Sequence, residues 1–268
     1  MLRILIVALA LAGCGGIAAE GELDTARAAG LRVGFATERP YAYISASGEV
    51  TGEAVETFRH TAAELGIEPM WVPLEFGELL SALESGRIDV IASGMFITPE
   101  RAQRVRFTLP TVCVGTAVVL RQDAPAGIVV PADLPACETC RFAVLSGSVE
   151  SDVVRALGVG DRTEHLPDLS TAAAALELGR ADILLISAPT ARQLVAAYPS
   201  LQLVEPAARS AGDAPAAGTG CAAFALRRDQ AELADSLDAR LRDFIGTPAH
   251  LDLLRSFGFS PGEAAFHP

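Results

Sequence analysis

The sequence predicts an α/β fold of two lobes, in which each lobe is a mostly parallel β-sheet flanked by helices. Two observations support this fold class. First, short apolar segments typical of strands alternate along the chain with segments that have apolar residues at helical spacing. Second, the chain has 268 residues, of which 50% are hydrophobic. Since domains usually have ~100–200 residues, this length predicts roughly two of them, with enough apolar residues for a sizeable core.

The first half of the chain contains three predicted strands, which are Leu31–Ala36, Met70–Pro73 and Ile88–Ser93. Helices are expected at residues 54–65 and 79–85, because apolar residues recur there at helical spacing and a glycine follows each segment. A third helix is expected to begin at Thr98, a good N-cap, with Pro99 in its first turn. Arg101 therefore lies in the first turn of this helix.

The second half repeats the alternation of strands and helices. The predicted strands are Phe142–Leu145, a short one near His165, Asp182–Ile186 and Cys221–Leu226. The predicted helices begin at Ser148 and cover Ser170–Leu178, Pro189–Ala197 and about Gln230–Ile245. Ligands of open α/β sheets bind beyond the carboxyl ends of the strands, and clefts between domains are frequent sites. The pattern alone predicts a two-lobed binding protein or enzyme.

The charge composition excludes several classes of function. The chain has 33 acidic and 21 basic residues, a formal net charge of −12, and every basic residue is arginine. Without lysine there is no Schiff-base lysine and no phosphate-loop lysine. The acidic balance argues against nucleic acid as a partner and against adhesion of the folded part to an anionic membrane. No GxSxG or HExxH sequence occurs, so we expect no catalytic residues, no metal site and no cofactor.

The N-terminus resembles a bacterial lipoprotein signal. Arg3 precedes the apolar stretch Ile4–Leu11, which is too short to span a bilayer as a helix, and small residues lead up to Cys14. We expect residues 1–13 to be a signal peptide, and residues 14–30 to be a lipidated cysteine followed by a linker. The competing interpretation is a buried N-terminal strand. A protein with this leader is exported to a periplasmic or other extracytoplasmic location and anchored to a membrane by lipid.

Cys137 and Cys140 form a CxxC sequence in a predicted loop before the strand Phe142–Leu145. A thioredoxin-like site would have its CxxC after a strand and at the start of a helix, and a zinc knuckle would need a second ligand pair. In an oxidising compartment, a local structural disulfide is the favoured interpretation.

Several sequence stretches together resemble family 3 of the bacterial extracellular solute-binding proteins. These stretches are Leu31–Gly34, Pro40–Tyr41, Thr51–Glu53, Leu65–Gly66, Leu83–Val90, Ser93–Arg101, Phe107–Pro110, Leu178–Asp182 and Gly218–Gly220. The resemblance implies a type II periplasmic-binding-protein fold and the permease of an ABC importer as partner. It implies that residues 31–112 and 220–268 form lobe 1, that residues 113–219 form lobe 2, and that the protein is a monomer.

The resemblance also predicts a hinge of two crossover strands, near Thr111–Gly115 and Gly218–Ala222. Cys113 and Cys221 lie on these two strands, so a disulfide that ties the hinge together is expected. The alternative is a pair of unpaired buried cysteines.

Within this family, the chain is most similar to the branch that binds ectoine and hydroxyectoine. The resemblance assigns ligand contacts to Glu38, Tyr41, Phe76, Gly94, Phe96, Arg101, Ser148 and Ser187. One departure is Thr37, where the branch tends to have asparagine. For Arg101 the competing interpretation is a surface ion pair with Glu100 or Glu75, and for each aromatic residue it is a place in the core.

The residue types favour a small zwitterion as the ligand. Arg101 offers a planar set of donors for a carboxylate, and Gly147-Ser148 at a helix start could add backbone N–H groups and a hydroxyl. Amino-acid binders of the family hold an ammonium group with a hydroxyl residue and an aspartate at the positions of Phe96 and Ser187. Aromatic faces suit a diffuse cation instead, with Glu38 as the counter-charge.

Other functions stay open at this point. A betaine or a polar amino acid is the nearest alternative ligand. An enzyme resembling cyclohexadienyl dehydratases, which share the fold, is a further alternative, with Glu38 as general acid.

Overall fold

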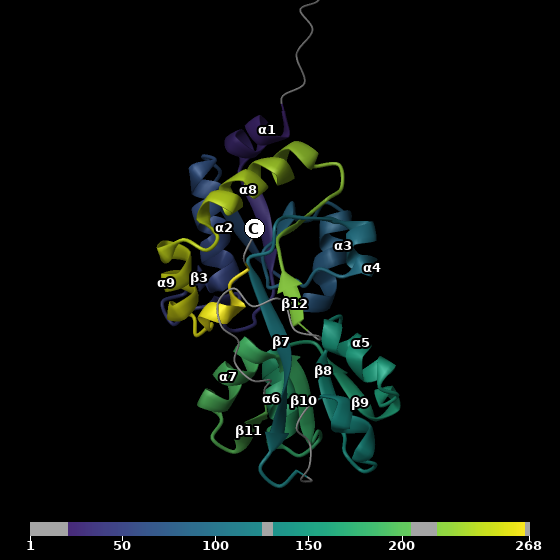
Figure 1. Ribbon diagram of the computed structural model, residues 1–268. Helices are drawn as coiled ribbons and strands as arrows, with labels where there is room; N and C mark the ends of the chain where they lie inside the picture. Colours follow the sequence, from purple (N-terminus) through teal and green to yellow (C-terminus); the bar gives the residue numbers. More distant parts are fainter. Residues whose placement is uncertain (1–20, 125–130, 205–218, 266–268) are drawn as a thin grey trace, which may run out of the picture.

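The computed structural model describes residues 21–124, 131–204 and 219–265. The predicted signal peptide and Cys14 lie outside the described residues. The chain forms two lobes, one above the other in Figure 1, and the long strand β7 (Val112–Arg121) runs from the upper lobe into the lower one. The predicted α/β fold class is confirmed, and we call the upper lobe lobe 1 and the lower lobe lobe 2.

Lobe 1 is built on a five-stranded sheet with the order β4-β1-β5-β13-β6. These strands are β4 (Pro69–Pro73), β1 (Leu31–Phe35), β5 (Val90–Ile91), β13 (Ala225–Leu226) and β6 (Arg106–Phe107). The first three are parallel, and β13 is antiparallel to both of its neighbours. A hairpin of β2 (Tyr43–Ile44) and β3 (Val50–Thr51) lies beside the sheet.

Helices cover both faces of this sheet. They are α1 (Glu22–Ala29), α2 (Glu53–Glu64), α3 (Leu79–Glu84), α4 (Pro99–Arg104), α8 (Ala231–Phe244) and α9 (Pro248–Ser256). On one face, Phe58 of α2 and Leu237 of α8 are fully buried in a large core, and on the other Leu79 and Leu83 of α3 are fully buried in a smaller one. Two 3-10 turns, η1 (Phe76–Glu78) and η4 (Pro261–Glu263), lie on the same lobe.

Lobe 2 is built on a sheet with the order β11-β7-β10-β8-β9. The further strands are β11 (Leu201–Val204), β10 (Ile183–Ser187), β8 (Phe142–Leu145) and β9 (Thr163–Leu166). Strands β10, β8 and β9 are parallel, whereas β7 is antiparallel to β10 and β11. The helices are α5 (Val149–Ala156), α6 (Leu169–Glu177) and α7 (Ala188–Ala197), with 3-10 turns η2 (Pro131–Ala136) and η3 (Gly160–Arg162).

The lobes are joined where β7 pairs with β12 (Thr219–Ala222), as Figure 1 shows. Cys113 and Cys221 are directly opposite each other in this antiparallel pair and form a disulfide. A second disulfide links Cys137 and Cys140 in the segment before β8. Both cysteine pairs therefore occur as cystines in the structure.

Several sequence-based boundaries are wrong, and tertiary contacts explain two of the differences. Part of the expected N-terminal linker forms helix α1, because α1 and α8 cap each other: Glu22 N donates to Glu232 at 3.0 Å, and Leu233 N donates to Glu22 at 3.1 Å. The expected strand Cys221–Leu226 is two strands, since β12 pairs with β7 and β13 joins the sheet of lobe 1. The expected strand Ile88–Ser93 has only two strand residues.

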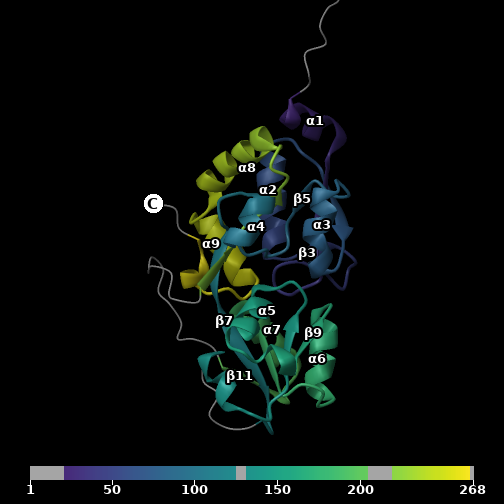
Figure 2. The same ribbon diagram turned by 90° about the vertical axis from the view of Figure 1, so that its right-hand side faces the viewer.

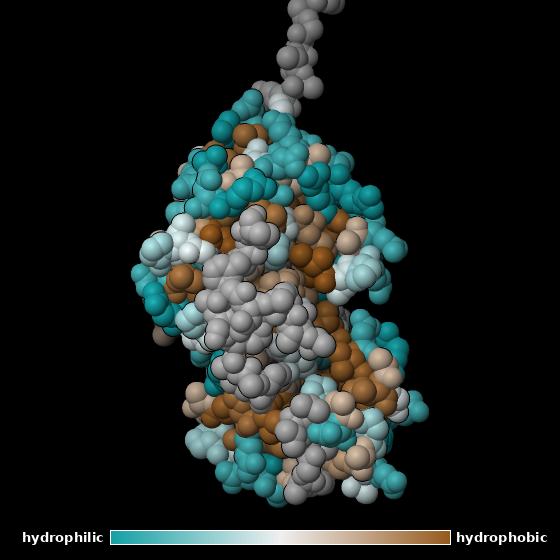
Figure 3. Space-filling view, viewed as in Figure 1, coloured by the Kyte–Doolittle hydropathy of each residue, from teal (hydrophilic) through white to brown (hydrophobic). Residues whose placement is uncertain are grey.

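Other elements match their predictions closely. Strand β8 has the predicted bounds, and Thr98 caps α4 by accepting a hydrogen bond from Arg101 N, with Pro99 in the first turn. On the face shown in Figure 3, hydrophilic side chains dominate the top of lobe 1, and apolar ones gather toward the middle of the molecule and on lobe 2. Among the described residues, no helix combines the length and apolar character needed to cross a membrane.

Candidate functional site

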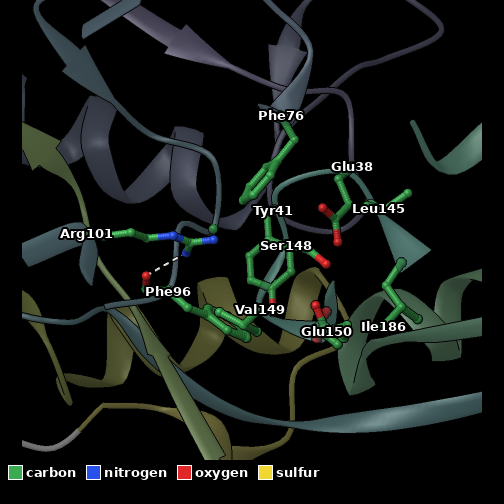
Figure 4. A pocket seen from close by; sticks show the side chains of 12 residues that line it. Glu38, Tyr41, Phe76, Phe96, Arg101, Leu145, Ser148, Val149, Glu150 and Ile186 are labelled. Carbon is green, nitrogen blue, oxygen red and sulfur yellow. Dashed lines mark hydrogen bonds between the residues drawn. The ribbon is translucent and has the colours of Figure 1, made fainter. Parts of the chain in front are cut away.

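The residues predicted to bind a ligand lie around one cavity between the two lobes (Figure 4). About 330 Å³ of space free of protein atoms, part of it open to solvent, lies within this cavity. Its lining comprises all eight predicted residues, Glu38, Tyr41, Phe76, Gly94, Phe96, Arg101, Ser148 and Ser187, together with Leu145, Val149, Glu150 and Ile186. Lobe 1 contributes the first six of these residues, and lobe 2 contributes the others.

Arg101 lies at one side of the cavity and reaches across to lobe 2. Its Nη1 donates to the Phe96 carbonyl at 2.7 Å, and its Nη2 donates to the Gly147 carbonyl at 2.8 Å. The side chain is buried, which lowers its pKa, while the nearby Glu150 carboxyl raises it. Within the described part of the chain Arg101 forms no ion pair, so the predicted alternative of a surface ion pair with Glu100 or Glu75 is wrong.

Glu38 lies at the opposite side of the cavity from Arg101 (Figure 4). Its Oε1 accepts a hydrogen bond of 2.8 Å from the Thr190 hydroxyl of α7, and Thr190 in turn accepts one of 2.9 Å from Ser187. Burial raises the pKa of Glu38 to about 7, with the Thr190 hydrogen bond lowering it and the Glu150 charge adding to the rise. Glu38 is half-buried, and its carboxyl group has no cationic partner among the described residues.

Glu150, in the first turn of α5, is a second carboxyl group on the cavity, and it was not among the predicted site residues. It is buried, and burial raises its pKa, although the Arg101 charge and the hydroxyls of Ser148 and Thr116 favour the ionised form. The Thr116 hydroxyl lies 3.4 Å from Oε1. The cavity thus combines one guanidinium with two carboxyl groups, which suits a ligand that has both an anionic and a cationic part.

Three aromatic rings line the cavity between the charged groups. In Figure 4 the rings of Phe76 and Phe96 lie above and below the ring of Tyr41, with Arg101 to one side and Glu38 to the other. All three side chains are buried. The guanidinium carbon of Arg101 lies 5.8 Å from the centroid of the Phe76 ring. The Tyr41 hydroxyl is buried without a hydrogen bond of good geometry to a described residue, and burial raises its pKa well above the usual value.

Two glycines make room for these rings. A Cβ atom at Gly94 would lie 2.6 Å from two atoms of the Tyr41 ring, and the φ angle of +62° there favours glycine. A Cβ at Gly220, on the hinge strand β12, would lie 2.6 Å from the Phe96 ring. The Tyr41 and Phe96 rings can therefore occupy these positions only because a glycine lies against each of them. For Phe96 this glycine belongs to the hinge strand β12.

The Ser148 backbone N–H was expected to donate to a ligand carboxylate, and this part of the prediction is wrong. The Ser148 N–H donates to the Leu145 carbonyl at 3.1 Å, so it does not face the cavity as a free donor. The buried Ser148 hydroxyl makes no hydrogen bond of good geometry to a described residue, although it lies close enough to Glu150 to favour the ionised form of that carboxyl group, and Ser148 lines the cavity.

A larger groove of about 1,240 Å³ adjoins the cavity and shares Glu38, Phe76 and Leu145 with it. No group of His, Cys, Asp and Glu side chains within the described ranges is arranged to hold a metal ion.

Glu150 and Thr190 are the polar residues of the site that sequence reasoning missed. The available signal for Glu150 was its place, two residues after Ser148, in the first turn of a helix that follows a buried strand. Thr190 likewise lies in the first turn of a helix that follows a strand end.

Curated proteins with similar sequences are binding proteins of transporters. The chain is 28% identical over 251 residues to the probable amino-acid ABC transporter periplasmic-binding protein y4tE of Sinorhizobium fredii, a match that covers 92% of this chain and 83% of that protein. It is 29% identical over 171 residues to the probable histidine-binding protein of Campylobacter jejuni, which covers 64% of this chain and 65% of that one.

Solved structures of the same fold include solute-binding proteins with different ligands. EhuB in complex with hydroxyectoine superimposes with a TM-score of 0.79 at 25% identity, over 90% of this chain and 93% of that one. A mutant of ArgBP from T. maritima superimposes with a TM-score of 0.76 at 24% identity, over 88% of this chain and 98% of that one, and this likeness concerns the fold alone.

The sequence model that describes bacterial extracellular solute-binding proteins of family 3 matches residues 31–253. This range includes the hinge strands and every residue that lines the cavity. The chain belongs to family 3 of the bacterial extracellular solute-binding proteins.

Proposed function

We propose that this chain is the solute-binding receptor of an ABC importer and that it captures a small zwitterion, ectoine or hydroxyectoine, between its lobes. The observation that carries the proposal is the single cavity that joins the Arg101 guanidinium, the Glu38 carboxyl group and three aromatic rings. Family membership and the transporter-binding proteins among its relatives support the receptor role.

The carboxylate of the ligand is assigned to the Arg101 side of the cavity. A guanidinium has five N–H donors in a planar arrangement, and the two carbonyl groups it contacts here leave others for a carboxylate. The buried Ser148 hydroxyl, which makes no hydrogen bond of good geometry to a described residue, adds a donor from lobe 2. The ligand anion would then be held from both lobes, which favours the closed arrangement.

The cation of the ligand is assigned to the Glu38 side. An ammonium group is compact and strongly hydrated, so it needs hydrogen-bond acceptors around it when it is buried. Phe96 offers an aromatic face, and Ser187 donates its hydroxyl hydrogen to Thr190. A delocalised ring cation suits these surroundings, because each aromatic face contributes ~0.5–2 kcal/mol without hydrogen bonding. EhuB, whose structure was solved with hydroxyectoine, is a relative in fold.

A basic amino acid is the second candidate ligand, and Glu150 is the observation that favours it. Two carboxyl groups and one guanidinium on the same cavity would balance a ligand with one carboxylate and two cationic groups. The adjoining groove offers room for a longer side chain. Relatives include proteins described as histidine-binding and arginine-binding.

The location and partners proposed for this protein follow from the N-terminal sequence and the family. We propose a lipid anchor at Cys14, an extracytoplasmic monomer and docking to permease subunits. Mass spectrometry of the membrane-extracted protein should show a diacylated or triacylated N-terminal cysteine, and the Cys14→Ser variant should lose it. Recovery of uncleaved, unacylated wild-type protein would contradict the anchor.

Isothermal titration calorimetry with a ligand panel tests the proposal. The panel contains ectoine, hydroxyectoine, proline betaine, histidine, arginine and glutamine. Ectoine or hydroxyectoine should bind tightest, and Phe96→Leu should weaken it by roughly 2- to 30-fold through loss of one aromatic face. Phe107→Leu, outside the cavity on β6, is the matched control. Tight binding of an amino acid with no binding of ectoine would overturn the ligand assignment, and turnover of prephenate or arogenate would overturn the receptor role.

A further inference from the structure

We propose that Thr190 is a positioning residue, which holds the Glu38 carboxyl group from the opposite lobe and so makes recognition of the ligand's cation depend on closure. The inference rests on the proposed function, because it concerns the same cavity. Thr190 does not line the cavity itself. It contacts Glu38, which does line the cavity.

The contact between the two residues joins the lobes. Thr190 Oγ1 donates to Glu38 Oε1 at 2.8 Å, although the two residues are 152 positions apart in the chain. Thr190 is fully buried in the first turn of α7, on lobe 2. The Glu38 backbone is fixed on lobe 1, because Glu38 N donates to Ala42 O at 2.7 Å and Ala42 N donates to Glu38 O at 3.0 Å. Separation of the lobes would therefore break the hydrogen bond.

The hydroxyl groups form a directed chain toward Glu38. Ser187 Oγ donates to Thr190 Oγ1 at 2.9 Å, so the hydrogen of Thr190 is directed at the carboxyl oxygen. A donor of this kind favours the ionised carboxyl group, because a hydrogen bond to a charged acceptor is stronger than one to a neutral acceptor. The N-terminal end of α7 also carries partial positive charge, which acts in the same direction.

The other groups around Glu38 show why such a donor matters. The titratable groups that share the cavity with Glu38 are Tyr41, Arg101 and Glu150, and those that share the adjoining groove are Arg39, Glu75, Asp168 and Tyr198. Burial and the Glu150 charge favour the protonated form of Glu38, and Thr190 opposes them. Closure thus supplies a hydrogen-bond donor to Glu38 from the opposite lobe. A cationic ligand group then meets a carboxylate that is already oriented and stabilised.

The equivalent arrangement at the other side of the cavity supports this inference. Arg101 of lobe 1 donates a hydrogen bond to the Gly147 carbonyl of lobe 2, just as Glu38 of lobe 1 accepts one from Thr190 of lobe 2. The residues assigned to the two ends of the ligand are therefore each oriented by a group from the opposite lobe. In the open state both would lose that orientation.

Three variants test the role of Thr190. Thr190→Val removes the donor and keeps the shape, Thr190→Ser keeps a hydroxyl, and Thr163→Val is a control on β9, where the hydroxyl donates to Val159 O away from the cavity. We expect Thr190→Val to weaken binding of the tightest panel ligand by about tenfold at pH 7, since the hydrogen bond involves a charged group. The ligand affinity of Thr190→Ser should stay within roughly threefold of that of the wild type, and the affinity of Thr163→Val should equal the wild-type affinity.

A second measurement separates this inference from the proposed function. The Glu38 side-chain carboxyl is titrated by carbon NMR in the ligand-free protein, and the pH dependence of affinity is measured by calorimetry. Thr190→Val should move the Glu38 midpoint to higher pH, and raising the pH should restore much of its affinity. Ser187→Ala should also move the Glu38 midpoint to higher pH, by a smaller amount. This variant replaces Thr190→Val in the test if Thr190→Val does not fold.

Each outcome decides one of the two claims. An unchanged Glu38 midpoint with unchanged affinity would overturn the positioning role. A loss of affinity that is equal at all pH values and is not rescued by Thr190→Ser would also overturn it, because a structural defect would act in this way. If no panel ligand binds the wild type, the proposed function fails, while the NMR midpoint still decides the contact between Thr190 and Glu38.

Discussion

Replacement of Arg101 by lysine is the perturbation that tests the anion side of the cavity. Arg101 donates to the Phe96 carbonyl at 2.7 Å and to the Gly147 carbonyl at 2.8 Å, and the proposal adds a ligand carboxylate. Lysine has one nitrogen and no planar array of donors, so it cannot satisfy all three acceptors with good geometry. Hydrogen bonds to charged groups contribute ~1.5–3 kcal/mol each, so losing one or two gives ~1.5–6 kcal/mol, or roughly a 10- to 20,000-fold loss of affinity.

Arg104→Lys is the matched control for Arg101→Lys. Arg104 is one turn away on the short helix α4 and donates from two nitrogens to the two carboxylate oxygens of Glu84, each at 2.7 Å, but this pair is exposed. Exposed ion pairs contribute ~0–1 kcal/mol, and the pair does not line the cavity, so its ligand affinity should match that of the wild type. Calorimetry with the tightest panel ligand gives both affinities. A folded Arg101→Lys protein that binds within threefold of the wild type would refute the assigned role of Arg101.

Three further predictions concern the architecture behind the cavity. Gly94→Ala should cost ~1–2 kcal/mol for the left-handed backbone and ~1–3 kcal/mol for the clash with Tyr41. Gly48→Ala has a similar φ of +85° with no atom within 4 Å of its Cβ, so urea unfolding should show only the backbone cost, and equal effects of both variants would contradict the clash. Burial raises the pKa of Glu53 from 4.5 to about 7, so the folded state holds this proton more tightly than the unfolded state and wild-type stability falls as pH rises through this range. Glu53→Gln should therefore be more stable than the wild type by up to about 3 kcal/mol at pH 8 and equal to it near pH 4.5, whereas a difference independent of pH would contradict the reasoning. The Cys113→Ser/Cys221→Ser double variant should lose ~2–4 kcal/mol of unfolding free energy because its disulfide spans 108 positions, and Cys137→Ser/Cys140→Ser, which spans 3, should lose less. The reverse order in urea unfolding would contradict this explanation.

Local signals in the sequence predicted the elements that depend on local interactions. The Thr98 cap and Pro99 fix the start of α4, and the apolar run Phe142–Leu145 is a buried central strand with the predicted bounds. Because parallel strands end at the same edge, residues after separate strands meet at one cavity, and the eight residues selected from the sequence do so. Their role in binding is part of the proposed function.

The remaining features depend on contacts between distant segments, which no local pattern encodes. Helix α1 was expected as linker because its sequence is short and rich in alanine, and it is stabilised by reciprocal capping with α8, about 210 positions away. Thr190 contacts Glu38 only because the two lobes meet. The segment 221–226 reads as one strand, but it changes partner from the hinge to the sheet of lobe 1.

A crystal structure of the protein with its tightest-binding ligand tests the central claim most directly. We expect a zwitterion whose carboxylate contacts Arg101 and Ser148 and whose delocalised cation lies among Tyr41, Phe76 and Phe96, with Glu38 bonded to it. An ammonium group held by Glu150, or a ligand bound outside this cavity, would contradict the claim.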